Sequence, residues 1–241
     1  MYLELSTVVR CKPSRIRFTP KWRKRICDCY RNDGGKGDFV LVAMIWRATP
    51  DRMVSFRRAV EFWQQFGDLR LFDSRHQVFN RAASRNRAVR EAERLGHSKL
   101  VITDADTIPE IHPTLDALDA VTDSAVHLPY DRCRVLDESD QMLGEFEFTC
   151  GGVYVTTVNG WFRFGGQDER FTQWAPEDFA FKMAHETLVG PMVRHHGVLM
   201  SLSHNRVSAK AAEDDSDVQL YRRYERANGN PEAMRDLCFL S

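Results

Sequence analysis

Apolar positions along the chain form continuous runs that alternate with helical stripes. Residues 38–46 are apolar almost throughout, which is typical of a strand buried on both faces of a sheet. In residues 51–66 the apolar positions are three and four apart, which predicts a helix with one apolar face. A short strand at 69–72, a helix at 80–95 and a strand ending at Asp104 follow. This order predicts a parallel sheet with helices packed on it.

The pattern changes after Pro109. We expect a helix at 113–121 and a strand at 124–128, whereas the alternating residues within 131–157 indicate antiparallel strands added to the parallel core. Another helix is expected from Pro176, because a first-turn proline followed by acidic residues is typical of a helix start. Further elements are then predicted: apolar runs at 188–193 and 198–202, and a charged helical tail from Ala211. The fold class is α/β, with a mostly parallel, Rossmann-like central sheet flanked by helices.

Composition is that of an ordinary globular protein. The 241 residues are 43% hydrophobic, and 34 basic residues balance 34 acidic ones, so no overall field favours nucleic acid or a membrane. The chain shows no basic leader followed by a long apolar run and no apolar stretch of membrane-spanning length, so we expect a cytoplasmic protein. Its six cysteines are too scattered for a secreted disulfide framework and are interpreted as reduced thiols.

Charge and glycine content divide the chain into three parts. Residues 1–37 carry ten Lys or Arg residues against three acidic ones and form a basic arm that ends in Gly34-Gly-Lys-Gly37. Residues 38–205 are expected to form the main domain, and 206–241 a helical extension. Cys11, Cys27 and Cys29 are weak candidates for a zinc site, because their spacing is unusual for one and no histidine follows nearby.

Asp104 and Asp106 close the strand of the sequence Lys99-Leu-Val-Ile-Thr-Asp-Ala-Asp106. Side chains alternate along a strand, so both carboxylates are expected on one side at the carboxyl end, where open α/β sheets bind ligands. Two such carboxylates repel each other unless a cation or hydrogen-bond donors offset them. Oxygen ligands suit Mg²⁺ or Mn²⁺ better than Zn²⁺. A divalent cation site is therefore predicted, and a solvated Asp-rich turn is the alternative.

Several motifs occur in an order that resembles GT-A fold glycosyltransferases over residues 38–205. The segment Ala82-Ala-Ser-Arg-Asn-Arg-Ala88 followed by the Asp-x-Asp strand resembles the first half of that fold. The later motifs are similar to the carboxyl half of the β-1,4-galactosyltransferases and polypeptide N-acetylgalactosaminyltransferases: Cys150-Gly-Gly-Val-Tyr-Val155, Phe164-Gly-Gly-Gln-Asp-Glu-Arg-Phe171 and Trp174-Ala-Pro-Glu-Asp178. The Asp-x-Asp motif alone is weak, and the ordered set is more specific.

The resemblance implies a hexose transfer from a nucleotide-diphosphate sugar, with UDP favoured, to an acceptor hydroxyl. Asp106 would bind Mn²⁺ or Mg²⁺, Asp104 would contact the ribose or sugar, and the cation would stabilise the departing diphosphate. Of the pair Glu177 and Asp178, the aspartate would be the general base, which predicts inversion. This chain has Ala175 and Pro176 where the family usually has glycines, a departure that weakens the assignment.

Other candidate positions surround these carboxylates. Asn86 shares a helix face with Ala82 and Val89 and is expected to point inward, toward the donor nucleotide, the Asp104 loop or neighbouring backbone. The resemblance places a third metal ligand after the last strands, where His204 fits best and His195 and His196 are rivals. The remaining candidates for the donor or sugar pocket are two glycines, two arginines just after the first strand and two tryptophans. The arginines equally fit solvated positions at a helix start, and tryptophans are more often core residues than sugar platforms. These candidates are Gly152, Gly166, Arg47, Arg52, Trp161 and Trp174.

Two other function classes remain open. Asp104-Ala-Asp-Thr107 also matches the nucleophile motif of haloacid-dehalogenase-like phosphatases, although the later acidic pair Asp214-Asp215 does not follow a strand. The basic arm alternatively suggests a nucleic-acid-binding module. The hypotheses of nucleic-acid binding and sugar transfer can also be combined. In that case a phage-type sugar transferase in the host cytoplasm would bind DNA through its basic arm and glycosylate a hydroxylated base. A protein or a glycan is the other acceptor class considered.

Overall fold

The computed structural model describes residues 40–47, 52–172, 176–202 and 216–239. These residues belong to one compact unit that spans residues 40–241. The basic arm with its three cysteines, Trp174, His204 and the Asp214-Asp215 pair lie outside the described residues. None of the helices in the described part is long and apolar enough to span a membrane.

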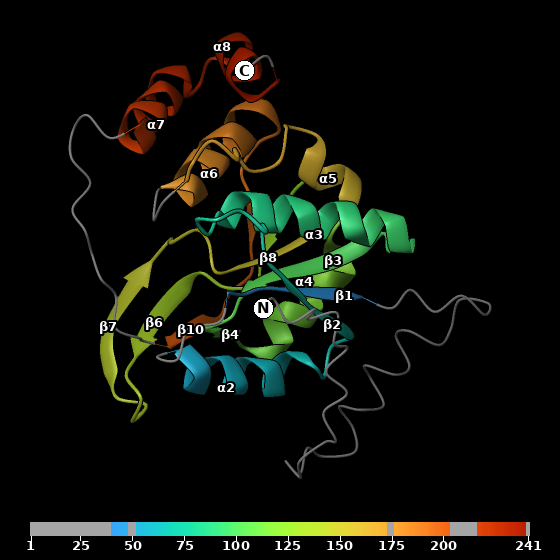
Figure 1. The fold of residues 1–241 in the computed structure, drawn as a ribbon, viewed down its shortest axis with the longest axis vertical. Coiled ribbons are helices and arrows are strands. Elements are labelled where there is room, and N and C mark those ends of the chain that lie inside the picture. The colour runs from blue at the N-terminus through green and yellow to red at the C-terminus, as the bar shows by residue number, and fades with distance from the viewer. Residues whose placement is uncertain (1–39, 48–51, 173–175, 203–215, 240–241) are drawn as a thin grey trace. The chain divides into compact units, whose positions relative to one another are not determined.

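A six-stranded mixed sheet forms the centre of the described unit (Figure 1). Strand β1 is fully buried and parallel to both of its neighbours, β2 and β3, which confirms the parallel core predicted from the apolar runs. Strand β8 is antiparallel to β3 and β5, whereas β9 is parallel to β5. The strands, in spatial order, are β2 (Asp68–Phe72), β1 (Leu41–Ile45), β3 (Lys99–Asp104), β8 (Val153–Thr157), β5 (His127–Leu128) and β9 (Val193–Arg194).

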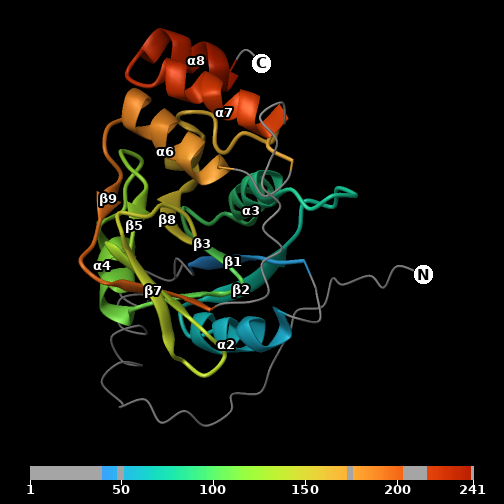
Figure 2. The same cartoon turned by 90° about the vertical axis from the view of Figure 1, so that its left-hand side faces the viewer.

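Helices cover both faces of this sheet. Helix α3 (Arg81–Leu95) lies on one face and α2 (Met53–Trp63) on the other (Figures 1 and 2). Most buried residues of α3 are small, alanine or serine, which allows the helix to lie close to the strands. The side chain of Asn80 caps α3 by accepting a hydrogen bond from the Ala83 amide at 2.8 Å. The other helices are α4 (Ile111–Ala120), α5 (Val158–Phe162), α6 (Glu177–Leu188), α7 (Ser216–Ala227) and α8 (Pro231–Phe239).

A second sheet of four strands lies beside the central one. It contains the antiparallel pair at 132–147, whereas β8, which also lies within 131–157, is an antiparallel strand of the central sheet. The order of the second sheet is β4 (Thr107–Pro109), β10 (Val198–Leu202), β6 (Arg132–Leu136) and β7 (Met142–Glu147). Strand β10 is antiparallel to β4 and parallel to β6, and β6 is antiparallel to β7. Strand β4 begins only three residues after Asp104, so the second sheet continues the chain directly from the carboxyl end of β3.

The C-terminal helices α7 and α8 pack against α6 (Figure 2). The Tyr224 hydroxyl donates to Asp168 at 2.9 Å, and Arg170 donates to the Leu237 carbonyl at 2.9 Å. The expected helical tail is therefore confirmed for residues 216–239. It covers the loop that follows α5 as well as α6.

Several element boundaries differ from the predictions. The helix predicted at 51–66 covers only 53–63, the helix predicted at 113–121 starts at Ile111, and the strand predicted at 124–128 is reduced to two residues. The apolar run 188–193 is not one element, because Gly190 and Pro191 separate the end of α6 from β9. Cys133, Cys150 and Cys238 are free thiols, in agreement with the expected reduced state of the described cysteines.

Candidate active site

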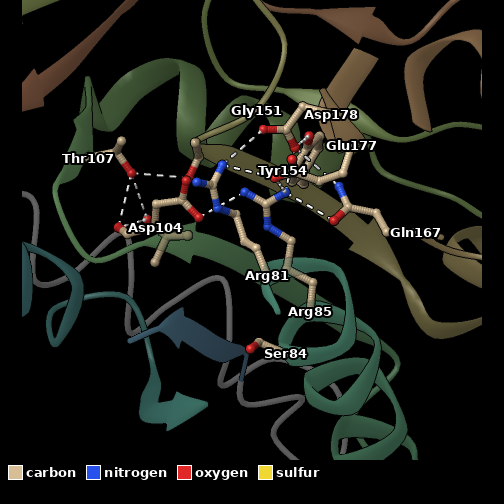
Figure 3. A network of polar contacts seen from close by, with 12 residues as sticks. Arg81, Ser84, Arg85, Asp104, Thr107, Gly151, Tyr154, Gln167, Glu177 and Asp178 are labelled. Carbon is tan, nitrogen blue, oxygen red and sulfur yellow. Dashed lines mark hydrogen bonds and ion pairs between the residues drawn. The ribbon is translucent and has the colours of Figure 1, made fainter. Parts of the chain in front are cut away.

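Three chain segments meet at the carboxyl end of β3. Strand β8 is antiparallel to β3, with Thr103 opposite Val153, so the glycines that precede β8 lie beside Asp104. The Asp104 amide donates to the Gly152 carbonyl at 2.8 Å. The start of α6, with Glu177 and Asp178, reaches the same place through contacts described below (Figure 3). Segments that are far apart in the sequence therefore converge at this edge of the sheet.

Asp104 is partly buried and already has a cationic partner. Its side chain is 19% exposed, and its Oδ1 accepts a hydrogen bond from Arg85 Nη2 at 2.8 Å. Thr107 donates to the Asp104 carbonyl at 3.1 Å and to the Gly152 carbonyl at 3.0 Å, which fixes the turn after β3. Asp106 is half-buried, and its carbonyl accepts from the Leu202 amide at 2.8 Å. The end of β10 therefore runs directly beside the second aspartate.

Two arginines of α3 point toward the carboxylates. Arg81 and Arg85 are four residues apart and so lie on one helix face. Arg85 is 1% exposed, pairs with both Asp104 and Asp178, and donates to Gln167 Oε1 at 3.0 Å. Arg81 is 25% exposed and its Nη1 lies 2.9 Å from Glu177 Oε1. Together they provide the positive charge that opposes the clustered carboxylates in Figure 3.

The two oxygens of Asp178 have different surroundings. Oδ1 accepts hydrogen bonds from Arg85, from the Tyr154 hydroxyl at 2.5 Å and from Gln167 Nε2 at 3.2 Å. Oδ2 faces Gly151, where a Cβ in place of the glycine hydrogen would lie 2.7 Å from Asp178 Cγ and overlap Oδ2 itself. Burial alone would raise the pKa of Asp178, but the nearby guanidinium groups and the Tyr154 hydrogen bond lower it below its usual value.

Glu177 is the more deeply buried carboxylate, with 3% of its side chain exposed. Its burial and the charge of Asp178 raise its pKa to about 7, although the arginines oppose this shift. Near neutral pH, Glu177 is thus divided between its protonated and ionised forms, whereas Asp178 is ionised. The two acidic residues at the start of α6 consequently differ in what they can do at neutral pH.

Asn86 points inward, as its position on the helix face predicted. Its Nδ2 donates to the Gln167 carbonyl at 2.7 Å and to Glu169 at 2.9 Å. Its Oδ1 accepts from Trp161 Nε1 at 2.8 Å and from the Gln167 amide at 3.0 Å. A Cβ on Gly166 would lie 2.7 Å from the same oxygen, and Gly166 has φ +74°. Asn86 therefore holds the loop that carries Gln167, in part through the backbone of that loop, which agrees with the backbone alternative, and its amide does not bond the Asp104 loop.

The other sequence candidates lie in different surroundings. Arg47 follows β1 and pairs with Asp73 at 2.6 Å, which holds the loop after β2, and Arg52 lies at the start of α2. Trp161 is fully buried in the core, so the structure favours the core alternative for it. The two histidine rivals of His204 have partners elsewhere: His195 contacts His127 at 3.0 Å and His196 contacts Asp131 at 2.6 Å.

The residues that contact the site carboxylates and hold them in place were not predicted from the sequence. Arg85, Gly151, Tyr154 and Gln167 occur within the motifs of the resemblance, and Arg81 directly precedes one of them. The sequence of α3 did contain a usable signal. Arg85 lies among small residues on the side of the helix that faces the sheet, and a buried arginine needs acidic partners. Those partners are the site carboxylates Asp104, Glu177 and Asp178.

The donor chemistry for a divalent cation is partly present. The described residues contain no group of three or more His, Cys, Asp and Glu side chains that could hold a metal ion. Asp104 and Asp106 offer oxygen ligands of the kind that Mg²⁺ and Mn²⁺ prefer, but one oxygen of Asp104 is engaged by Arg85. The third ligand predicted from the sequence, His204, follows β10, whose last residue lies beside Asp106. The cation site stays a prediction.

Comparison with known proteins shows the fold. No family model and no curated protein matches the chain. The crystal structure of GalNAc-T7 with UDP, GalNAc and Mn²⁺ is similar, with a TM-score of 0.52 and 12% identity over 81% of this chain. The match spans only 44% of the length of that protein. A mannose-1-phosphate geranyltransferase from Thermus thermophilus, with 11% identity, covers 68% of this chain and 73% of its own at a TM-score of 0.34. By its similarity to the first of these structures, the described unit has a GT-A type fold.

Proposed function

We propose that this chain is a glycosyltransferase that moves a sugar from a nucleoside-diphosphate sugar to an acceptor hydroxyl. The observation that carries the proposal is the convergence of Asp104 with the pair Glu177 and Asp178 at the carboxyl edge of a GT-A type sheet. The sequence resemblance assigns Asp104 to the donor, where it would contact the ribose or the sugar. The start of α6 supplies a carboxylate for the acceptor from the opposite side. UDP is the nucleotide that the resemblance favours.

Asp178 is the proposed general base, and Oδ2 is its reactive oxygen. Oδ1 has three hydrogen-bond donors, whereas Oδ2 packs against the backbone of Gly151 and lies 3.6 Å from Arg81 Nη1. The acceptor hydroxyl gives its proton to Oδ2 while its oxygen bonds to the anomeric carbon. The bond from that carbon to the diphosphate oxygen breaks, and its electron pair leaves with the diphosphate. A single displacement of this kind inverts the anomeric centre.

The leaving diphosphate needs positive charge around it. Arg81 is the more exposed of the two arginines and belongs to the same charged cluster, so it is suited to contact an anionic donor. Asp106 and Asp104, with His204 as a third ligand, would hold Mn²⁺ or Mg²⁺, which when bound neutralises charge on the diphosphate. Gln167, held by Asn86, orients Asp178 from the other side of the site.

A panel of nucleotide sugars with Mn²⁺ tests the proposal. Released nucleoside diphosphate is measured with three acceptor classes: a glycan, a peptide, and DNA that carries hydroxylated bases. We expect one donor and acceptor pair to turn over, with loss of metal-dependent turnover in Asp106→Ala and a loss of about 100-fold or more in Asp178→Asn. Asp119→Asn, on the exposed end of α4, is the matched control and should retain activity.

Two results would reject the proposal. Unchanged turnover in Asp106→Ala and Asp178→Asn would separate the activity from this site. Trapping of a phosphoaspartate at Asp104, with phosphate ester hydrolysis and no sugar transfer, would instead establish the phosphatase class that the Asp104-Ala-Asp-Thr107 motif also matches.

A further inference from the structure

One guanidinium group joins the donor side of the site to the acceptor side. Arg85 Nη2 donates to Asp104 at the end of β3, and Arg85 Nη1 donates to Asp178 in the first turn of α6. The same Nη1 also contacts Gln167 at 3.0 Å. The guanidinium carbon lies 5.3 Å from the centre of the Tyr154 ring, and Tyr154 itself donates to Asp178 (Figure 3).

Packing alone does not account for an arginine at this position. Arg85 is buried on a helix face whose other members are mostly small, and its charge is taken fully out of water. Burying an ion costs several kcal/mol, and an apolar replacement of a buried ion pair is often neutral or stabilising. Among the described residues, moreover, nothing accepts a hydrogen bond from its buried Nε. The arginine therefore carries a cost that a hydrocarbon side chain would avoid.

We propose that Arg85 is a positioning residue that sets the spacing between Asp104 and Asp178 and so places the base relative to the bound donor. This inference rests on the proposed function. A guanidinium is flat and rigid, so two carboxylates bound to its neighbouring nitrogens are held at a defined separation. A lysine in its place keeps one positive charge but offers a single nitrogen on a flexible stem. It cannot set that spacing.

Kinetics of Arg85→Met and Arg85→Lys test the proposal, with Arg94→Met as control. Arg94 lies on the same helix, is 67% exposed and pairs with Glu91, one turn away on that helix. We expect Arg85→Met to lower kcat about 100-fold, the effect of a misplaced reacting group, while the donor KM changes less than about threefold. Arg85→Lys should recover less than about a tenth of the lost kcat, and Arg94→Met should behave as wild type.

A double variant separates positioning from general damage. If Arg85 acts through Asp178, then Asp178→Asn and the double variant Arg85→Met/Asp178→Asn have the same kcat, because the base is already lost. Further loss of about tenfold or more in the double variant would overturn the inference. Wild-type kcat in Arg85→Met would also overturn it. Full recovery of kcat in Arg85→Lys would do the same, because a positive charge without fixed spacing would then be sufficient.

Thermal unfolding gives a readout that does not need activity. Arg85→Met removes the guanidinium group shared by two largely buried carboxylates, so its Tm should fall, and adding Asp104→Asn and Asp178→Asn should restore more than half of that fall. Equal Tm values for the single and triple variants would overturn the proposed coupling. If wild-type protein transfers no sugar from any donor, the proposed function fails, and this measurement alone decides whether Arg85 couples the two carboxylates.

Discussion

Replacing Gly151 with alanine tests whether the close approach of Asp178 Oδ2 to the Gly151 backbone matters. Gly151 has φ +103°, a backbone conformation that costs a residue with a side chain about 1–3 kcal/mol. In addition, the new Cβ would lie 2.7 Å from Asp178 Cγ and 3.3 Å from Asp178 Cβ. Either the strand end or the Asp178 side chain must shift. We therefore expect both a loss of stability and a displaced base.

A matched glycine separates the two effects. Gly229, between α7 and α8, has φ +78° and nothing within 4 Å of the Cβ that alanine would add. Gly229→Ala should lose about 1–3 kcal/mol of unfolding free energy for the backbone reason alone and keep its kcat. Gly151→Ala should lose at least as much stability and also about 100-fold in kcat, which corresponds to about 2.7 kcal/mol of transition-state stabilisation.

Urea denaturation and steady-state kinetics on the same preparations measure both quantities. Comparison of m-values shows whether the variants unfold in the same way as the wild type. If Gly151→Ala keeps wild-type kcat while its stability falls like that of Gly229→Ala, the close approach of Oδ2 to Gly151 has no catalytic role. The assignment of that oxygen as the proton acceptor would then be abandoned.

Two further predictions concern the residues around the base. Asn86→Ala removes four hydrogen bonds and leaves Trp161 Nε1 and the Gln167 backbone without these partners. The free energy of unfolding, measured by urea denaturation, should fall by at least about 2 kcal/mol, and a fall under about 0.5 kcal/mol would contradict this. The raised pKa of Glu177, about 7, means that the folded state binds more protons than the unfolded state above the ordinary glutamate pKa, so the contribution of Glu177 to stability should fall as pH rises from about 5 to about 8. The lowered pKa values of His127, His185 and His195 act with the opposite sign. The lowered pKa of Asp178 has the opposite sign and acts at lower pH, where stability is lost as pH falls. Glu177→Gln should remove this downward contribution, so its stability relative to the wild type should rise between about pH 5 and 8, and a pH dependence equal to that of the wild type would contradict the raised pKa.

Local patterns predicted the elements that carry most of the fold. The apolar runs of β1 and β3 and the capped start of α3 at Asn80 depend on residues close together in sequence. The short strand β5 and the separation of α6 from β9 were harder to predict, because a two-residue strand has no periodicity and Gly190 acts within an apolar run. The carboxylates of the site were predicted from their motifs. Their arginine partners were not, since Arg85 meets Asp104 and Asp178 at sequence separations of 19 and 93 residues.

The charge balance of the site indicates which positive groups are available to an anionic donor. In Figure 3 two guanidinium groups face three carboxylates, and partial protonation of Glu177 near neutral pH brings the cluster close to neutrality. Arg85 is committed to Asp104 and Asp178, so it offers little charge to an incoming diphosphate. Asp106 lies beside the end of β10, next to this cluster. Within the described part of this cluster, attraction of the diphosphate therefore rests on Arg81, on a cation held at Asp106, or on both. A chelator would remove the contribution of the cation and leave that of Arg81.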